Sequence, residues 1–236
     1  MRHTAPQSAI VKKTIPIVYE DETLCIVDKP SGIPVQSGAR VSVCLTDILK
    51  RQLESEIFPV HRLDKETSGL LVIAKSAAAA RVCRTLFDSQ TVEKEYTAVC
   101  FGGLKGNTDN KCPSKGIIDT PIMENGALRQ ALSEYNILAE TDKYSLFSVR
   151  LHSGRMHQIR IHLAGIGYPI IGDDKHGNFL LNKQLWKTAR IKKLQLCACR
   201  LRFPINGKNR LFTVPLPDHM QTAIEALIGL PYGKPL

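Results

Sequence analysis

The chain has 236 residues, of which 43% are hydrophobic and 23% are charged. This is the composition of a globular protein, and it excludes a disordered chain or a fibre. The longest apolar runs are short, as in Leu70–Ala74, far below the roughly 18 residues that a membrane-spanning helix needs. Residues 1–13 lack the apolar stretch of a secretory signal, so we expect an N-terminal tail there and a cytoplasmic protein.

The formal net charge of +10 is concentrated in the C-terminal third of the chain. Residues 1–150 hold 19 basic and 18 acidic side chains, whereas the rest of the chain holds 13 basic and 4 acidic ones. No acidic side chain occurs between Lys175 and Pro217. From Lys187 to Arg210, cations are interleaved with apolar residues, which suits a strand that presents one face to phosphates. The charge favours a polyanionic partner, and a solvated strand face is the alternative.

The spacing of cysteines and histidines predicts neither a disulfide framework nor a metal site. The seven cysteines are odd in number and form no Cys-x-x-Cys pair. His152, His157 and His162 are five residues apart, whereas two ligands on one helix face are four apart. We therefore expect no metal.

The first half of the chain combines strand and helix patterns. Thr46 is a suitable N-cap for an amphipathic helix that ends before Pro59, and Ser76 is a suitable N-cap for an alanine-rich helix. The expected elements are, in order, a strand at 23–28, the first helix, a charged loop at 61–69, a strand at 70–74, a helix at 77–87 and a strand at 93–100 with Tyr96, Ala98 and Cys100 on one face.

The second half predicts a hairpin, two helices and two further strands. Gly167 is placed to end a helix whose apolar residues recur from Met156 to Ile166. The expected elements are an exposed loop at 102–113, strands at 131–140 and 143–152 joined at Thr141–Asp142, the helix at 156–166, a loop at 172–178, a short helix at 180–187, and strands at 194–203 and 210–215. This mixture without strict alternation predicts an α+β fold with a mostly antiparallel sheet, as a single domain over 14–236.

Asp64 lies in the charged loop, immediately before a buried strand, where a carboxylate can be held at the mouth of a cleft. An aspartate in a polar loop is usually structural. However, the run His61–Val72 resembles the H-R-L-D-x-x-T-S-G-L signature of the RluA-type family of RNA pseudouridine synthases.

Further segments resemble the same family in the same order. Leu24–Val27 with the loop at 29–32 is similar to its opening strand, and Glu93–Ala98 is similar to its K-x-Y-x-A strand. Gly154–Leu163 resembles its G-R-x-H-Q-I-R-x-H-L segment and Tyr168–Asp173 follows it, while Cys197 stands where the family has histidine. The similarity at 172–177 favours the branch that modifies large-subunit ribosomal RNA.

The resemblance implies the pseudouridine synthase fold, with a catalytic cleft across the sheet, and isomerisation of uridine to pseudouridine in RNA. The N1–C1′ bond is broken, the base turns, and C5 is joined to C1′, a balance that requires no cofactor. The resemblance makes Asp64 the catalytic carboxylate, which either attacks C1′ or removes the C2′ proton. Arg160 matches its cationic partner, and Tyr96 is expected to stack on the uracil or to serve the proton transfer at C5.

The expected RNA-binding residues carry charge or hydrogen-bond donors near these motifs. They are Arg62, Lys29, Arg155, His157, Gln158 and Lys193. Asp64 follows only 63 residues, so no N-terminal S4 domain is expected, and the basic C-terminal third should bind the RNA.

Two other functions are also compatible with the sequence. One is a catalytically inactive RNA-binding module that acts as an RNA chaperone, and the other is a hydrolase that releases uracil with Asp64 and a second carboxylate such as Glu66. For the synthase, ribosomal RNA is the expected substrate, transfer RNA is the alternative, and the protein is expected to be a monomer.

Overall fold

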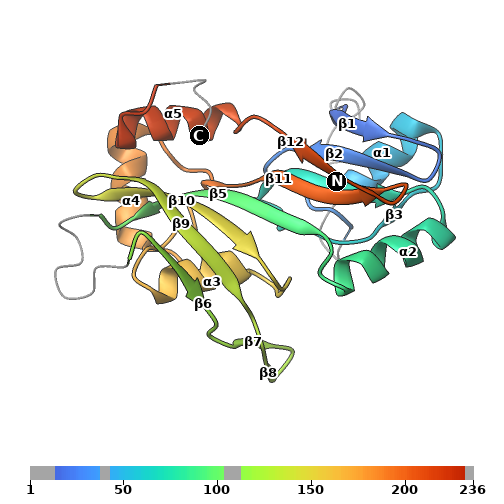
Figure 1. The fold of residues 1–236 in the computed structure, drawn as a ribbon. Helices are drawn as coiled ribbons and strands as arrows, with labels where there is room; N and C mark the ends of the chain where they lie inside the picture. Colours follow the sequence, from blue (N-terminus) through green and yellow to red (C-terminus); the bar gives the residue numbers. More distant parts are fainter. Residues whose placement is uncertain (1–13, 38–42, 104–112, 232–236) are drawn as a thin grey trace, which may run out of the picture.

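A ten-stranded sheet runs through the computed structural model, which describes residues 14–37, 43–103 and 113–231 (Figure 1). The central path of the sheet is β1 (Ile17–Glu20), β2 (Leu24–Lys29), β4 (Ser68–Ala74), β11 (Leu196–Ile205), β5 (Glu93–Phe101), β10 (Tyr144–Leu151), β9 (Ser133–Glu140) and β6 (Lys115–Ile118). Two further strands join it, with β3 (Phe58–Pro59) on β4 and β12 (Lys208–Thr213) on β11. All of its pairs are antiparallel except β4 with β11, which confirms the predicted α+β fold with a mostly antiparallel sheet.

Helices cover both faces of the sheet. α1 (Leu45–Leu53) and α3 (Gln158–Gly165) pack on the face that carries Tyr96, Ala98 and Cys100 of β5, as the strand pattern predicts. The other face is covered by α2 (Ala77–Asp88), α4 (Phe179–Ala189) and α5 (Asp218–Ile228). No helix in the described ranges is long and apolar enough to cross a membrane.

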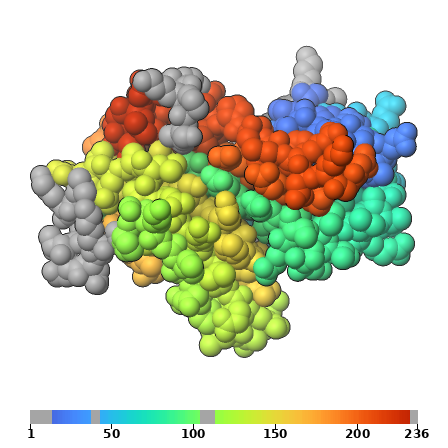
Figure 2. Space-filling model, in the orientation of Figure 1, coloured from blue at the N-terminus to red at the C-terminus, as the bar shows by residue number. Residues whose placement is uncertain are grey.

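A small hairpin stands apart from the main sheet. β7 (Ile122–Glu124) pairs with β8 (Ala127–Arg129), and Figure 2 shows this part of the chain protruding from the lower edge of the molecule. The turn contains Asn125 and Gly126, both with positive φ. The sequence pattern did not predict this hairpin, because its strands are only three residues long.

Several helix and strand boundaries differ from those predicted. α1 begins at Leu45 with Cys44 as N-cap, not Thr46, because Asp47 accepts hydrogen bonds from both the backbone and the thiol of Cys44. α3 begins at Gln158, not Met156, because His157 adopts a left-handed conformation that a helix excludes. α5 and the short strands β1, β3 and β6 were missed. The predicted tail at 1–13 and residues 104–112 of the predicted loop lie outside the described residues.

The basic strand near the C-terminus is β11, and it does bury one of its faces. Leu201 and Phe203 are buried in the core. However, the cations that alternate with them along the strand pair with acidic residues of β5: Arg200 lies 3.9 Å from Glu95, and Arg202 lies 3.5 Å from Glu93. Part of the positive charge expected to face phosphates is therefore compensated within the sheet.

Gly69 allows the one parallel strand pair of the sheet to form. It lies opposite Ala198 with φ +107°, and a Cβ atom there would be 2.3 Å from the Ala198 carbonyl oxygen. We expect Gly69→Ala to lower the free energy of unfolding by about 3 kcal/mol or more, because β4 and β11 would have to separate. Urea unfolding measures this. Gly165→Ala, in open space at the end of α3, is the matched control and should be neutral or slightly stabilising.

Candidate active site

The loop that carries Asp64 is held rigidly before β4. The backbone N–H of Thr67 donates to the Asp64 carbonyl at 3.2 Å, and buried Leu63 anchors the loop in the core. A second loop clasps it, because Gly32 donates its N–H to the Lys65 carbonyl at 2.8 Å and the Ser31 hydroxyl donates to the Glu66 carbonyl at 2.7 Å. The Asp64 side chain is therefore presented from a fixed backbone.

Lys29 joins these two loops instead of facing RNA. Its side chain is fully buried, and its ammonium donates to the carbonyls of Pro30, Ile33 and Lys65 at 2.9–3.1 Å. Burial lowers the pKa of Lys29 to about 8, although Glu66 and Asp64 partly offset this effect. All three ammonium hydrogens are used within the protein, so the expectation that Lys29 contacts RNA does not fit its position.

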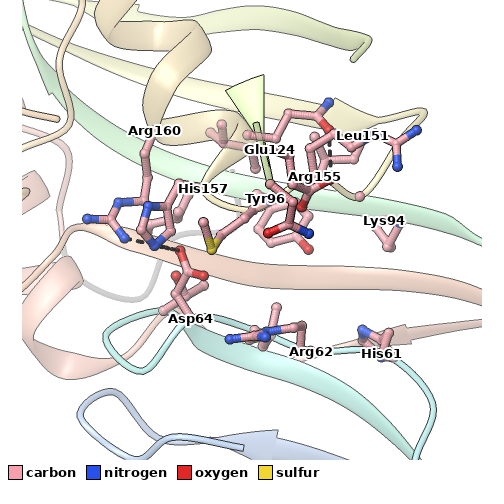
Figure 3. A pocket seen from close by; sticks show the side chains of 18 residues that line it. His61, Arg62, Asp64, Lys94, Tyr96, Glu124, Leu151, Arg155, His157 and Arg160 are labelled. Atoms are coloured by element: carbon pink, nitrogen blue, oxygen red, sulfur yellow. Dashed lines mark hydrogen bonds and ion pairs between the residues drawn. The ribbon is translucent and has the colours of Figure 1, made fainter. Parts of the chain in front are cut away.

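Arg160 connects Asp64 to a second carboxylate, Asp173. The Nε–H and Nη2–H of its guanidinium donate to the two oxygens of Asp173 at 2.7 Å. Nη1 donates to Oδ2 of Asp64 at 3.1 Å (Figure 3). Burial raises the pKa of Asp173, but the hydrogen bonds from Arg160 and from backbone N–H groups outweigh it and lower that pKa below its usual value. The expected pairing of Asp64 with Arg160 is therefore present, with Asp173 orienting the arginine.

His157 approaches the same carboxylate from the start of α3. Its Nε2 lies 3.8 Å from Oδ2 of Asp64, and its Nδ1 is 2.8 Å from Nε2 of His176 (Figure 3 shows His157 beside Asp64). Burial lowers the pKa of His157, and the charge of Arg160 adds to this effect while Asp64 opposes it. His157 thus faces Asp64, although the sequence assigned it to RNA binding.

A pocket of about 350 Å³ opens in front of Asp64, between the Asp64 loop, β5 and the start of α3. Tyr96 lies in its wall and is buried, and burial together with the negative charge of Asp64 raises the pKa of its hydroxyl. Cations surround the opening. The side chains labelled in Figure 3 are His61, Arg62, Asp64, Lys94, Tyr96, Glu124, Leu151, Arg155, His157 and Arg160.

The remaining RNA-binding candidates are placed differently from one another. Arg62 is exposed at the pocket, and Arg155 lines it while donating to the Gln130 carbonyl at 3.1 Å. The amide of Gln158 is buried and satisfied by four hydrogen bonds, to Ser153, Leu132, Ser133 and the backbone of Arg155, so it shapes the turn before α3. Lys193 is exposed but does not line the pocket.

Sequence reasoning missed four residues of this site. Asp173, His176, Lys94 and Glu124 were not named as candidates, yet Asp173 and His176 contact the residues that hold Asp64, and Lys94 and Glu124 line the pocket. Asp173 falls within the segment 168–173 that matched the family, and Lys94 is the first residue of the K-x-Y match, so the signal for both was present. Nothing in the sequence pointed to Glu124.

The position of Glu66 does not support the hypothesis of a hydrolase that uses Asp64 and Glu66 together. It does not line the pocket, and it forms an exposed ion pair with Lys65 at 3.7 Å. Among residues 14–37, 43–103 and 113–231, no group of three His, Cys, Asp or Glu side chains is arranged to hold a metal ion.

His61 provides a pH-dependent part of the stability. Its Nε2 accepts a hydrogen bond from the backbone N–H of Val72 at 2.9 Å, and its ring packs on Phe87. Burial, helped by the charge of Lys94, lowers its pKa from 6.5 to about 3. The unfolded chain takes up a proton below about pH 6.5 while the folded chain does not, so the free energy of unfolding falls as pH falls, by about 1.4 kcal/mol per pH unit from this group.

Urea unfolding of the wild type and His61→Gln at pH 6.5 and 5.5 measures this effect. The histidines at 157, 162, 176 and 219 also have pKa values lowered by burial and act in the same direction, so the informative quantity is the difference between the two slopes. We expect a shallower slope for His61→Gln by about 1 kcal/mol over this pH unit, because the unfolded histidine is already half protonated at pH 6.5. Equal slopes would show that His61 titrates normally in the folded protein.

The fold places the chain in a known structural class. It matches the structure of human RNA pseudouridylate synthase domain containing 4 with a TM-score of 0.74 and 26% identity, over 92% of this chain and 94% of that one. Human RNA pseudouridylate synthase domain containing 1 has the same fold, with a TM-score of 0.70 and 21% identity. The sheet and its flanking helices therefore form the pseudouridine synthase fold.

The sequence comparisons define the family. Residues 23–165 match the family model described as RNA pseudouridylate synthase. The chain is 31% identical to ribosomal large subunit pseudouridine synthase D of Nitrosomonas europaea, over 92% of this chain and 67% of that protein. It is also 31% identical to tRNA pseudouridine synthase C of Haemophilus ducreyi, over 79% of this chain and 84% of that protein. The chain belongs to the RNA pseudouridine synthase family and is an isomerase that acts on RNA.

Proposed function

We propose that this synthase converts uridine to pseudouridine in large-subunit ribosomal RNA, with Asp64 as its catalytic carboxylate. The observation that carries the role of Asp64 is its position: it lies at the base of the pocket, beside Tyr96, with Arg160 donating to it at 3.1 Å. A carboxylate that accepts a hydrogen bond from a buried guanidinium is held in one orientation, from which it can attack C1′ or remove the C2′ proton. The related synthases named for ribosomal and for transfer RNA make transfer RNA the second candidate substrate.

The chemistry asks little else of the protein. The N1–C1′ bond breaks, the uracil turns within the pocket, C5 bonds to C1′, and the C5 proton leaves while N1 gains one. The ring of Tyr96 offers a surface on which the uracil stacks. Its hydroxyl is protonated at neutral pH, and burial with the charge of Asp64 raises its pKa further. We assign to this hydroxyl a part in the proton transfer at C5.

The RNA must deliver an unstacked uridine to this pocket, at a cost of a few kcal/mol. The cations around the opening, Arg62, Lys94 and Arg155, are suited to hold the phosphates on either side of that nucleotide. Lys94 is largely buried and burial lowers its pKa, so an approaching phosphate would find an ammonium that has little competing solvation.

The proposal includes the organisation of the whole chain. Residues 14–236 act as one catalytic domain in the cytoplasm, and as a monomer. One sheet that takes in strands from β1 to β12 supports the single domain. Sedimentation equilibrium tests the monomer, for which a mass of 26.2 kDa is expected.

The substrate is tested with unmodified transcripts of large-subunit ribosomal RNA and of transfer RNAs, each labelled with tritium at uracil C5. We expect tritium release from the ribosomal transcript, followed by mapping of pseudouridine to defined positions. Release from transfer RNA alone would select the second candidate substrate. No release from either RNA, with protein that is folded and binds RNA, would contradict the proposed function.

A further inference from the structure

Two histidines and the Asp64–Arg160–Asp173 cluster form a closed ring of polar contacts. His157 reaches Asp64 with Nε2 and His176 with Nδ1. The backbone N–H of His176 donates to Oδ1 of Asp173 at 3.0 Å. Arg160 donates hydrogen bonds to both Asp173 and Asp64, which closes the ring. Asp173 therefore fixes both donors that face the carboxylate, Arg160 directly and His157 through His176.

The backbone at His157 is held in an unusual conformation for this purpose. It has φ +57° as the N-cap of α3, a left-handed conformation that costs a residue other than glycine roughly 1–2 kcal/mol. Its side chain makes no capping hydrogen bond to the helix. The strained backbone instead directs the imidazole between Asp64 and His176, where both ring nitrogens have a partner.

The positions of the partners decide which nitrogen of His157 carries hydrogen. If His157 donated from Nδ1 to His176, the lone pair on its Nε2 would face the Asp64 carboxylate and repel it. If His176 donates from Nε2 to Nδ1 of His157, the hydrogen of His157 is on Nε2 and points at Asp64. Burial lowers the pKa of His157 and so favours a neutral ring, and of the two neutral forms only the second makes both contacts favourable.

We propose that His176 fixes the tautomer of His157, so that the Nε2–H of His157 points at the Asp64 carboxylate from 3.8 Å, beside the hydrogen bond that Arg160 donates. Both histidines are then positioning residues, and the inference rests on the catalytic role proposed for Asp64. A neutral imidazole orients the carboxylate without adding positive charge. The other charged groups that face the two histidines are Asp64 itself, Asp173, Arg160 and Lys175. Arg160 already places one positive charge beside Asp64, and a protonated His157 would add a second, which would weaken Asp64 as a nucleophile or base.

The test compares His176→Phe, which keeps a ring but no donor, with His176→Gln, whose amide can still donate to Nδ1 of His157. For His176→Phe we expect kcat for tritium release to fall about 10-fold, the effect typical of removing a residue that orients another, with little change in KM for RNA. We expect His176→Gln to recover most of that loss. Wild-type kcat in the phenylalanine variant, or no recovery with glutamine, would overturn the inference.

The tautomer itself is read by ¹⁵N NMR of imidazole-labelled wild-type protein. We expect His157 protonated on Nε2 in the wild type and partly on Nδ1 in His176→Phe. A wild-type His157 protonated on Nδ1 would overturn the inference even if the variants do not fold. Asp64→Asn separates the two proposals: an active Asp64→Asn enzyme refutes the proposed function, whereas an inactive one beside unaffected His176 variants refutes only this inference.

Discussion

Replacing Asp64 by asparagine is expected to lower the rate of tritium release from C5-labelled RNA by at least about 10³-fold. Asparagine has the same shape, and its amide oxygen can still accept from Arg160, but it can neither attack C1′ nor take the C2′ proton. RNA binding should persist, because Asp64 contributes no positive charge toward phosphates. Single-turnover tritium release measures the rate, and filter binding measures the affinity.

Glu66→Gln is the matched control for this change. Glu66 lies two residues away on the same loop, is exposed and does not line the pocket. It undergoes the same loss of a carboxylate, and we expect activity close to that of the wild type. Equal losses in Asp64→Asn and Glu66→Gln would show that the charge of the loop, and not the Asp64 carboxylate, supports the reaction.

Replacing Arg160 by methionine should lower the free energy of unfolding by about 3–5 kcal/mol, the usual cost of leaving a buried partner unpaired. Asp173 is 1% exposed and receives two of the three hydrogen bonds that Arg160 donates to side chains. Asp64 loses the hydrogen bond from Arg160 as well, so activity should also fall. Urea unfolding gives the stability, and tritium release at a temperature where the variant is folded gives the activity.

Two control variants separate the loss of stability in Arg160→Met from a general effect of losing an arginine. Arg81→Met, on the exposed face of α2, should change stability by no more than about 0.5 kcal/mol. Arg160→Lys keeps the charge but cannot form the two parallel bonds to Asp173, so we expect a loss between those of the other two variants. An Arg160→Met protein as stable as Arg81→Met would contradict the part assigned to the buried cluster.

The elements with strong local patterns were predictable from the sequence. Ser76 caps α2, where its hydroxyl accepts from the N–H of Ala79, and the alternation of β5 places Tyr96 on the face where the pocket forms. The missed strands of the main sheet depend on distant partners. β1 and β6 are short edge strands, and β3 is two residues long, so each is defined by its pairing more than by its own composition.

The residues of the site that could be predicted are those that lie within the sequence motifs shared with the family. Asp64, Tyr96 and Arg160 come from three segments far apart in the chain, and the structure brings them to one pocket. Lys29 and Gln158 lie in the same motifs but hold the backbone that carries the site, because their polar groups are buried and satisfied. Spacing alone does not tell a side chain that faces the pocket from one that supports it, since both are polar residues beside the same loops.

The isomerisation itself is tested most directly by the nucleoside balance of the RNA. Unmodified ribosomal transcript is incubated with the wild-type protein and digested to nucleosides, and uridine, pseudouridine and free uracil are measured together. Our account predicts that each uridine lost appears as one pseudouridine, with no free uracil. Free uracil equal to the uridine lost would identify a hydrolase, and an unchanged nucleoside composition on RNA that the protein binds would leave only an RNA-binding module.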